Sequence, residues 1–190
     1  LEESWDIISG ADILPGGTGG DDMFTYDNSS LMDGLTLSAS YTPSDGTSEV
    51  ESSSDYGLKY TGIEGLTIGA GAGEDNSAAA SIDLTNMYVK YTMDAFSVGY
   101  QASEADSETA NADKDFQAIG LSYAVSEDLS VSINSSTIEF ENSSLSDQEA
   151  TGFGISYTMG SMTLAGTHNS VDNVAGTSTS DISGYEVALS

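Results

Sequence analysis

One stretch, residues 65–100, constrains the fold most strongly, because its side chains alternate with a period of two. It reads GLTIGAGAGEDNSAAASIDLTNMYVKYTMDAFSVGY. In three segments, apolar and aromatic residues occupy every second position, and Gly, Ser, Thr or Lys occupy most of the positions between. A period of two is typical of β-strands, because successive side chains point to opposite faces. The stretch therefore predicts a strand, a long polar loop, a strand, a very short turn and another strand.

The same alternation recurs along the chain and predicts eleven strands, the first over residues 23–28. From residue 62 onward, short turns (GIEG, MDA, SED and MGS) alternate with acidic loops of roughly ten residues, the pattern of an outer-membrane meander with two different ends. This predicts an all-β fold, an antiparallel up-and-down transmembrane β-barrel. One strand slips in parity between Ile133 and Ile138, which predicts either a β-bulge or the emergence of that strand from the membrane.

The two predicted faces differ in a way that favours a membrane barrel over a soluble one. A soluble barrel fills its interior with large side chains, whereas here one face is Gly, Ser and Thr, which suits a water-filled lumen. Aromatic residues near the short turns are predicted to form an interfacial girdle. They are Tyr60, Tyr91, Phe96, Tyr123 and Tyr157. The predicted lumen-facing wall includes Asp55, Lys59, Tyr88, Lys90, Gln101 and Glu186.

Composition narrows the class of protein further. The chain has 190 residues, enough for one sizeable domain, and carries 31 acidic residues against three lysines and no arginine. A formal charge of -28 argues against a nucleic-acid partner, because phosphate binding needs a cationic surface. The absence of cysteine excludes a disulfide framework and thiolate metal sites. The sequence has no run of eighteen apolar residues, so it predicts no transmembrane helix. A transmembrane β-barrel does not need such a helix.

The order of these features resembles the Gram-negative general diffusion porins. Three parts of the sequence carry the resemblance: residues 24–41, the hairpins around Asp94, Ser126 and Gly160, and the final stretch 172–190. The first is similar to the strand pair after the inward-folded third loop of that family. The hairpins are similar to its periplasmic turns, and the ending is similar to its last strand.

The resemblance implies one porin barrel domain over residues 1–190, part of a sixteen-stranded barrel that forms a homotrimer in the outer membrane of a Gram-negative bacterium. Its surroundings would be outer-membrane lipid and lipopolysaccharide. If Met23 begins the sixth strand, the eleventh strand of this chain is the sixteenth of the family. The first five strands and the usual terminal aromatic residue are then missing. Since the sequence also starts at Leu1, we expect a partial or processed chain.

The resemblance also assigns residues 1–22 to the inward-folded loop that narrows the pore in this family. Six carboxylates are candidates for that constriction. They are Glu2, Glu3, Asp6, Asp12, Asp21 and Asp22. For any single one of these residues, the alternative is an ordinary solvated acidic loop, which the residues alone favour. The expected function is passive diffusion of small hydrophilic solutes and ions. A weak cation preference is expected as well, because carboxylates near a pore raise the local cation concentration.

Other chemistry receives little support from the sequence. The acidic outer loops are expected to bind Ca²⁺ or Mg²⁺ at most loosely, and no other cofactor is expected. A single Gly/Asp-rich stretch at 16–22 resembles a calcium turn, but such turns work as tandem repeats. His168, the single histidine, has no catalytic partner at a recognisable spacing, so we expect no enzyme. The alternatives are a surface-exposed β-barrel interaction protein, such as an adhesin or phage receptor, and a soluble secreted all-β protein.

Overall fold

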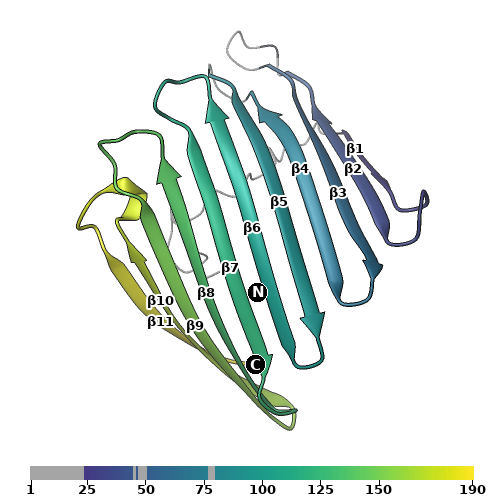
Figure 1. The fold of residues 1–190 in the computed structure, drawn as a ribbon, viewed down its shortest axis with the longest axis vertical. Coiled ribbons are helices and arrows are strands. Elements are labelled where there is room, and N and C mark those ends of the chain that lie inside the picture. The colour runs from purple at the N-terminus through teal and green to yellow at the C-terminus, as the bar shows by residue number, and fades with distance from the viewer. Residues whose placement is uncertain (1–23, 45, 47–50, 77–79) are drawn as a thin grey trace.

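A computed structural model describes residues 24–44, 46, 51–76 and 80–190, which form a single antiparallel sheet with its strands in chain order (Figure 1). The strands are β1 (Phe24–Asn28), β2 (Leu35–Thr42), β3 (Ser53–Ile63), β4 (Leu66–Asp75), β5 (Ile82–Met93), β6 (Phe96–Ser107), β7 (Lys114–Ala124), β8 (Leu129–Phe140), β9 (Gln148–Met159), β10 (Met162–Asp172) and β11 (Ile182–Leu189). Within these ranges, β1 and β11 lie at opposite edges, and no helix is long and apolar enough to cross a membrane. The all-β, antiparallel class and the eleven strands are thus confirmed, and the described sheet is open.

Each strand pairs with the next over nearly its whole length. The β5–β6 ladder, for example, runs without a slip from Met93 opposite Phe96 to Ile82 opposite Ser107. Turn residues with a positive φ close several of the hairpins: Gly65 at 73°, Asp94 at 49° and Gly160 at 66°. Glycine adopts this conformation without steric cost. Short turns and uninterrupted ladders together fix which side chains share a face.

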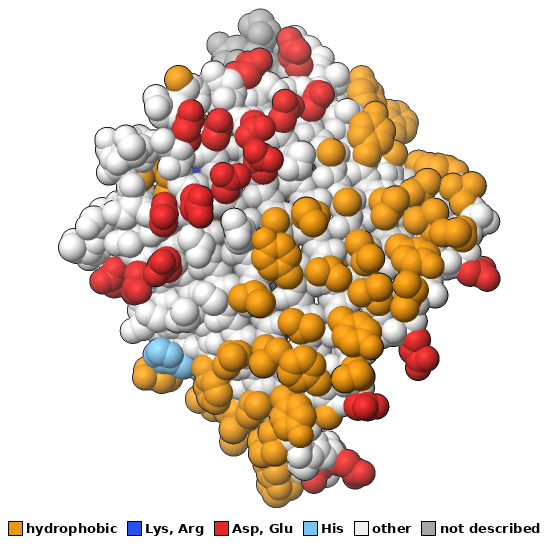
Figure 2. All heavy atoms as spheres, in the orientation of Figure 1, with side chains coloured by type: hydrophobic (Ala, Val, Ile, Leu, Met, Phe, Trp, Pro, Cys, Tyr) orange, Lys and Arg blue, Asp and Glu red, His pale blue; other side chains and the backbone are white. Residues whose placement is uncertain are grey.

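In this sheet the apolar face is the more exposed one and the polar face is the more buried one, which is the reverse of a water-soluble protein. We call the face that carries Ile68, Val89, Tyr100 and Ile119 the apolar face; these four residues form one cross-strand row. Their side chains are exposed, Ile119 to 55%, whereas the side chains of the opposite, polar face are mostly half-buried. Figure 2 shows the apolar side chains as a broad band across the molecule. Such a band is what lipid contact favours.

The parity slip in β8 has a simple explanation. The pairing of β7 with β8 is continuous from Lys114 opposite Phe140 to Ala124 opposite Ser130, so the predicted β-bulge is wrong. The period of two continues, but each face of β8 changes from apolar to polar, or from polar to apolar, along the strand. Beyond Ile133 the apolar face carries Ser135, Thr137 and Glu139, and Ile138 lies on the polar face. This change fits the other interpretation, in which the strand leaves the membrane. The register shift in this sheet instead lies between β3 and β4, beside their short turn.

A small apolar core lies on the polar face near the long loops. It consists of Phe116, Ile138, Ala150 and Val171. Beside it, the loop 141–147 meets the 3₁₀ turn η1 (Val174–Gly176), because the Ser146 amide donates to the Gly176 carbonyl at 3.0 Å. The Ala175 amide also donates to the buried Gln148 Oε1 at 2.7 Å. These hydrogen bonds hold two loops against the long-loop end of the sheet, beside the small apolar core.

Replacing Val89 by lysine tests the assignment of the apolar face. Val89 lies between Ile68 and Tyr100, and a lysine there would place a charge in lipid. We expect Val89→Lys to lower the free energy of unfolding by about 2–4 kcal/mol. Urea titration in phospholipid vesicles measures this loss. Gln101→Lys, on the polar face of the neighbouring strand, is the control and should cost much less. Equal losses in the two variants would contradict the assignment.

Candidate pore-lining face

The polar face gathers the side chains that the sequence predicts for a channel wall. Lys59, Gly69, Tyr88 and Gln101 form one row across β3 to β6. The other predicted wall residues, Asp55, Lys90 and Glu186, share this face in the registers of their own strands. The structure therefore brings the predicted set onto one side of the sheet. Its contact with a pore stays a prediction.

On the polar face, two large side chains lie over glycines, which have no Cβ to obstruct them. The Tyr88 ring lies directly over Gly69, so a Cβ at Gly69 would collide with the Tyr88 ring carbons. Asp55 lies over Gly73 in the same manner. A glycine in a strand often marks such a close approach of neighbouring groups. The large polar side chains consequently lie along the wall over these glycines.

Charges on the polar face are nearly balanced. Four carboxylates and three lysines share it within the described strands. They are Asp27, Asp55, Asp75 and Glu186, and Lys59, Lys90 and Lys114. Two of the carboxylates are held by hydroxyl groups of β2: Ser38 donates to Asp27 Oδ1 at 2.5 Å, and Ser40 donates to Asp55 Oδ2 at 2.8 Å. The polar face is therefore weakly acidic, in contrast to the strong acidity of the whole chain.

Many of the remaining carboxylates form a row on the apolar face, which we call the acidic belt. Its members are Glu74, Asp83, Glu104, Asp106, Asp115, Glu139, Glu149 and Asp172. Each is exposed and lies near the long-loop end of its strand. Figure 2 shows the acidic side chains beside the apolar band. The belt was not predicted from the sequence, although counting in steps of two from the apolar residues of each strand would have placed it.

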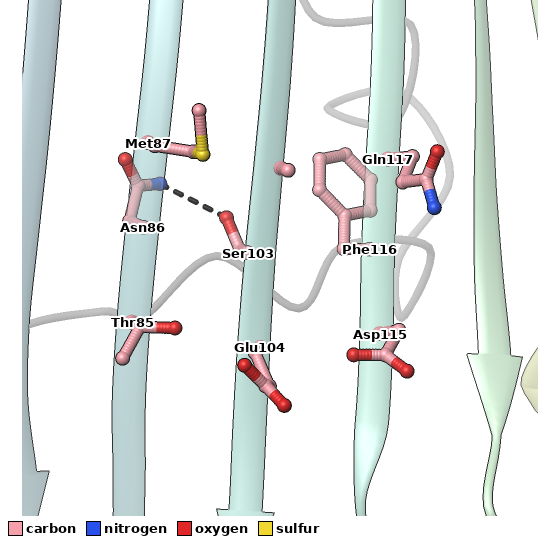
Figure 3. A pocket seen from close by; sticks show the side chains of 9 residues that line it. Thr85, Asn86, Met87, Ser103, Glu104, Asp115, Phe116 and Gln117 are labelled. Atoms are coloured by element: carbon pink, nitrogen blue, oxygen red, sulfur yellow. Dashed lines mark hydrogen bonds between the residues drawn. The ribbon is translucent and has the colours of Figure 1, made fainter.

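A shallow hollow marks the line where the belt meets the apolar band (Figure 3). It encloses about 420 Å³ between β5, β6 and β7. Ala102 leaves the space because its side chain is small, while Met87 and Gln117 flank it on the apolar side and Glu104 and Asp115 on the acidic side. By the strand registers, these five side chains belong to the apolar face, so the hollow lies on the side of the sheet opposite the polar face.

The predicted girdle residues share the apolar face near the short turns. Phe96 is paired with Tyr123, Tyr91 with Leu66, and Tyr157 with Leu129. Tyr60 lies opposite Ile68. Rings at this height are suited to a membrane interface, since aromatic side chains with a polar tip concentrate there. Their contact with lipid stays a prediction.

The remaining candidates divide into those the structure places and those it does not. The six constriction carboxylates at positions 2 to 22 lie outside the described residues. His168 lies within β10 on the apolar face, its ring 4.3 Å from that of Tyr185 and tilted by 48°. Among the described residues, no group of three or more His, Asp or Glu side chains could hold a metal ion. Loose binding of Ca²⁺ or Mg²⁺ at the loops stays a prediction.

Comparisons with known proteins agree with this arrangement. The sequence model of the family described as Gram-negative porin matches residues 4–168. No curated protein matches the chain. Among solved structures, the anion-selective porin from Comamonas acidovorans has a TM-score of 0.74 at 11% identity, with 88% of this chain and 58% of that chain covered. OmpF of Salmonella typhi, in complex with daunomycin, has a TM-score of 0.67 at 12% identity, with 88% and 60% covered. OmpT of Vibrio cholerae has a TM-score of 0.63 at 17% identity, with 97% and 72% covered.

The fraction of each solved porin that this chain covers also shows how much of a porin barrel the chain corresponds to. It spans 58% of the Comamonas porin and 62% of an in-vitro folded OmpT of Vibrio cholerae. At such low identities, the likeness to solved structures carries the fold alone. The eleven-stranded open sheet thus corresponds to somewhat more than half of a porin barrel.

Single cysteines distinguish the two faces directly, because the sequence contains no other thiol. Tyr100 and Gln101 are neighbours in β6 and lie on opposite faces. We expect Gln101→Cys to react readily with a water-soluble, membrane-impermeant maleimide in proteoliposomes, since its thiolate can form in water. Tyr100→Cys should stay largely unlabelled until detergent is added. Labelling yield by mass spectrometry is the readout, and faster labelling at position 100 would overturn the assignment of the polar face.

Proposed function

Because this chain belongs to the Gram-negative porin family, we propose that it supplies most of the wall of a passive diffusion channel for small hydrophilic solutes. Membership in the family places the chain in the outer membrane of a Gram-negative bacterium. One observation carries the proposal: below the acidic belt, the exposed side chains of the strands are mostly apolar, and Gly, Ser, Thr and Asn lie on the less exposed face. This is the order that a wall between lipid and water requires. Diffusion through such a wall involves no covalent step, so we assign no enzymatic reaction.

A weak cation preference is the second part of the proposal. Support comes from the charges of the polar face, where carboxylates outnumber lysines by one within the described strands. Further carboxylates at the long-loop ends, such as Glu108 and Glu141, add a negative field near the mouth. The porin from Comamonas acidovorans is anion-selective on a similar fold. The fold by itself therefore does not decide the sign, and the proposed preference depends on the side chains of this chain.

The assembly is also part of the proposal. One of the similar structures is a trimer form of OmpT of Vibrio cholerae. We extend this to a homotrimer of the present protein, surrounded by outer-membrane lipid and lipopolysaccharide through the apolar face. Ca²⁺ or Mg²⁺ would associate loosely with the acidic loops, because hard cations prefer oxygen ligands.

Reversal potentials in planar bilayers test the channel and its preference together. We expect stepwise conductance and a reversal potential under a KCl gradient that reports modest cation selectivity. Asp55→Asn should reduce the permeability ratio of K⁺ to Cl⁻ by roughly twofold, since charges separated by several ångströms of water interact by about 1 kcal/mol or less.

The matched control is Glu104→Gln. It removes the same charge from the acidic belt on the opposite face and should leave the permeability ratio nearly unchanged. Anion selectivity in the unmodified protein would refute the cation preference. Absence of any stepwise conductance would refute the channel itself.

A further inference from the structure

A pocket on the polar face lies across β7 to β10 and is distinct from the row of Lys59, Tyr88 and Gln101 across β3 to β6. It encloses about 250 Å³. Six polar side chains line it: Ser122, Ser130, Ser132, Asn134, Ser156 and Thr167. We call it the hydroxyl pocket. None of its lining residues is charged, although Glu186 lies next to Thr167 on β11.

The pocket exists because β9 carries a glycine at its centre. Gly154 lies between Ser132 on one neighbouring strand and Thr167 on the other. A Cβ at Gly154 would come within 2.6 Å of Ser132 Oγ and would lie 3.8 Å from Thr167 Cγ2. The missing side chain therefore leaves room for a small molecule to reach both hydroxyl-bearing strands.

Two polar atoms of the pocket lack partners. Within the part of the chain that the structure describes, Asn134 Oδ1 and Thr167 Oγ1 are the buried side-chain oxygens with no hydrogen bond. Buried polar groups are nearly always hydrogen-bonded, and leaving one unpaired is costly. Asn134 Oδ1 needs a donor, whereas the Thr167 hydroxyl can donate or accept. Both residues line the same pocket, so a solute bound there lies beside both of them.

We propose that the hydroxyl pocket is a binding site for a small neutral polyhydroxylated solute, such as a single sugar ring or a short polyol. Hydroxyl groups of the solute both donate and accept, which matches the serine, threonine and asparagine groups of the wall. The absence of lining charges favours a neutral solute over an ion. A volume below the range of about 300–1,000 Å³ typical of drug-sized ligands limits the solute to a small one.

This inference rests on the proposed function and deepens it by naming a solute class. A wall site assists diffusion only if it binds strongly enough to attract the solute and weakly enough to release it. A few neutral hydrogen bonds in a wet lumen meet this condition, because water competes for the same groups. Transport of such solutes is then faster than their size alone would give.

Saturation-transfer NMR on the purified protein in detergent tests the site, with D-glucose as the probe. We expect saturable transfer to glucose, and none to the dimethyl ether of diethylene glycol, which is neutral but has no hydroxyl groups. Thr167→Val removes the unpaired hydroxyl at nearly constant volume and should weaken glucose binding about two- to tenfold, the effect of one neutral hydrogen bond. Ser132→Ala is a second variant in case the first fails to fold, as judged by heat-modifiable gel mobility.

The matched control is Thr36→Val, which makes the same change on the polar face of β2, away from the pocket. It should leave glucose binding unchanged. Equal binding in Thr167→Val and Thr36→Val, equal transfer to the hydroxyl-free ether, or no saturable transfer at all would overturn the site. Planar-bilayer conductance is read separately: channels that conduct without glucose binding refute the pocket alone, whereas glucose binding without conductance refutes only the channel.

Discussion

Hydrogen bonding between neighbouring backbones is the constraint on which the rest of this structure depends. A chain in lipid finds no water to satisfy its amide and carbonyl groups, so a sheet must satisfy them between its own strands. The ladders run almost unbroken from β1 to β11, with one register shift beside the short turn of β3 and β4. Every side chain is then committed to one of two faces, because a slip by one residue would exchange them.

The strand registers place the carboxylates on two different faces, whereas the net charge of the chain adds them together. The excess of acidic residues points to a strongly negative channel, yet the described polar face is close to neutral. The acidic belt accounts for part of the difference, since its carboxylates have the parity of the apolar residues below them, and other carboxylates, such as Asp94, Glu127 and Glu141, lie in turns and loops. Net charge alone is thus a poor guide to what a permeating ion meets, and the parity of each carboxylate is a better one.

The fold could be predicted from the sequence because period two is strict and the short turns are recognisable. Parity alone also predicts a common face for Lys59, Tyr88, Lys90 and Gln101, and the strand registers place them on one face, whose contact with a pore stays a prediction. The slip between Ile133 and Ile138 was ambiguous, since a bulge and a change of surroundings alter the apolar pattern in the same way. Continuous pairing of β7 with β8 resolves it, and pairing is a property of two strands.

The hydroxyl pocket could not be predicted for a related reason. Ser132, Gly154 and Thr167 are distant in sequence and unremarkable singly, and their meaning depends on lying side by side across three strands. Whether Asn134 Oδ1 has a partner depends on side-chain geometry, which periodicity does not contain. Periodicity therefore predicts the faces of a wall, but not the local chemistry of a patch on it.

The acidic belt has a consequence for the surroundings of the barrel in the membrane plane. A neighbouring barrel or lipid headgroup that approaches sideways at the height of the belt meets a negative surface. Repulsion between two such surfaces extends over about 8 Å at physiological ionic strength and shortens as salt is added. In the proposed assembly, contact between the belt-bearing surfaces of two barrels is therefore opposed by a salt-dependent force that originates on the outside of the wall.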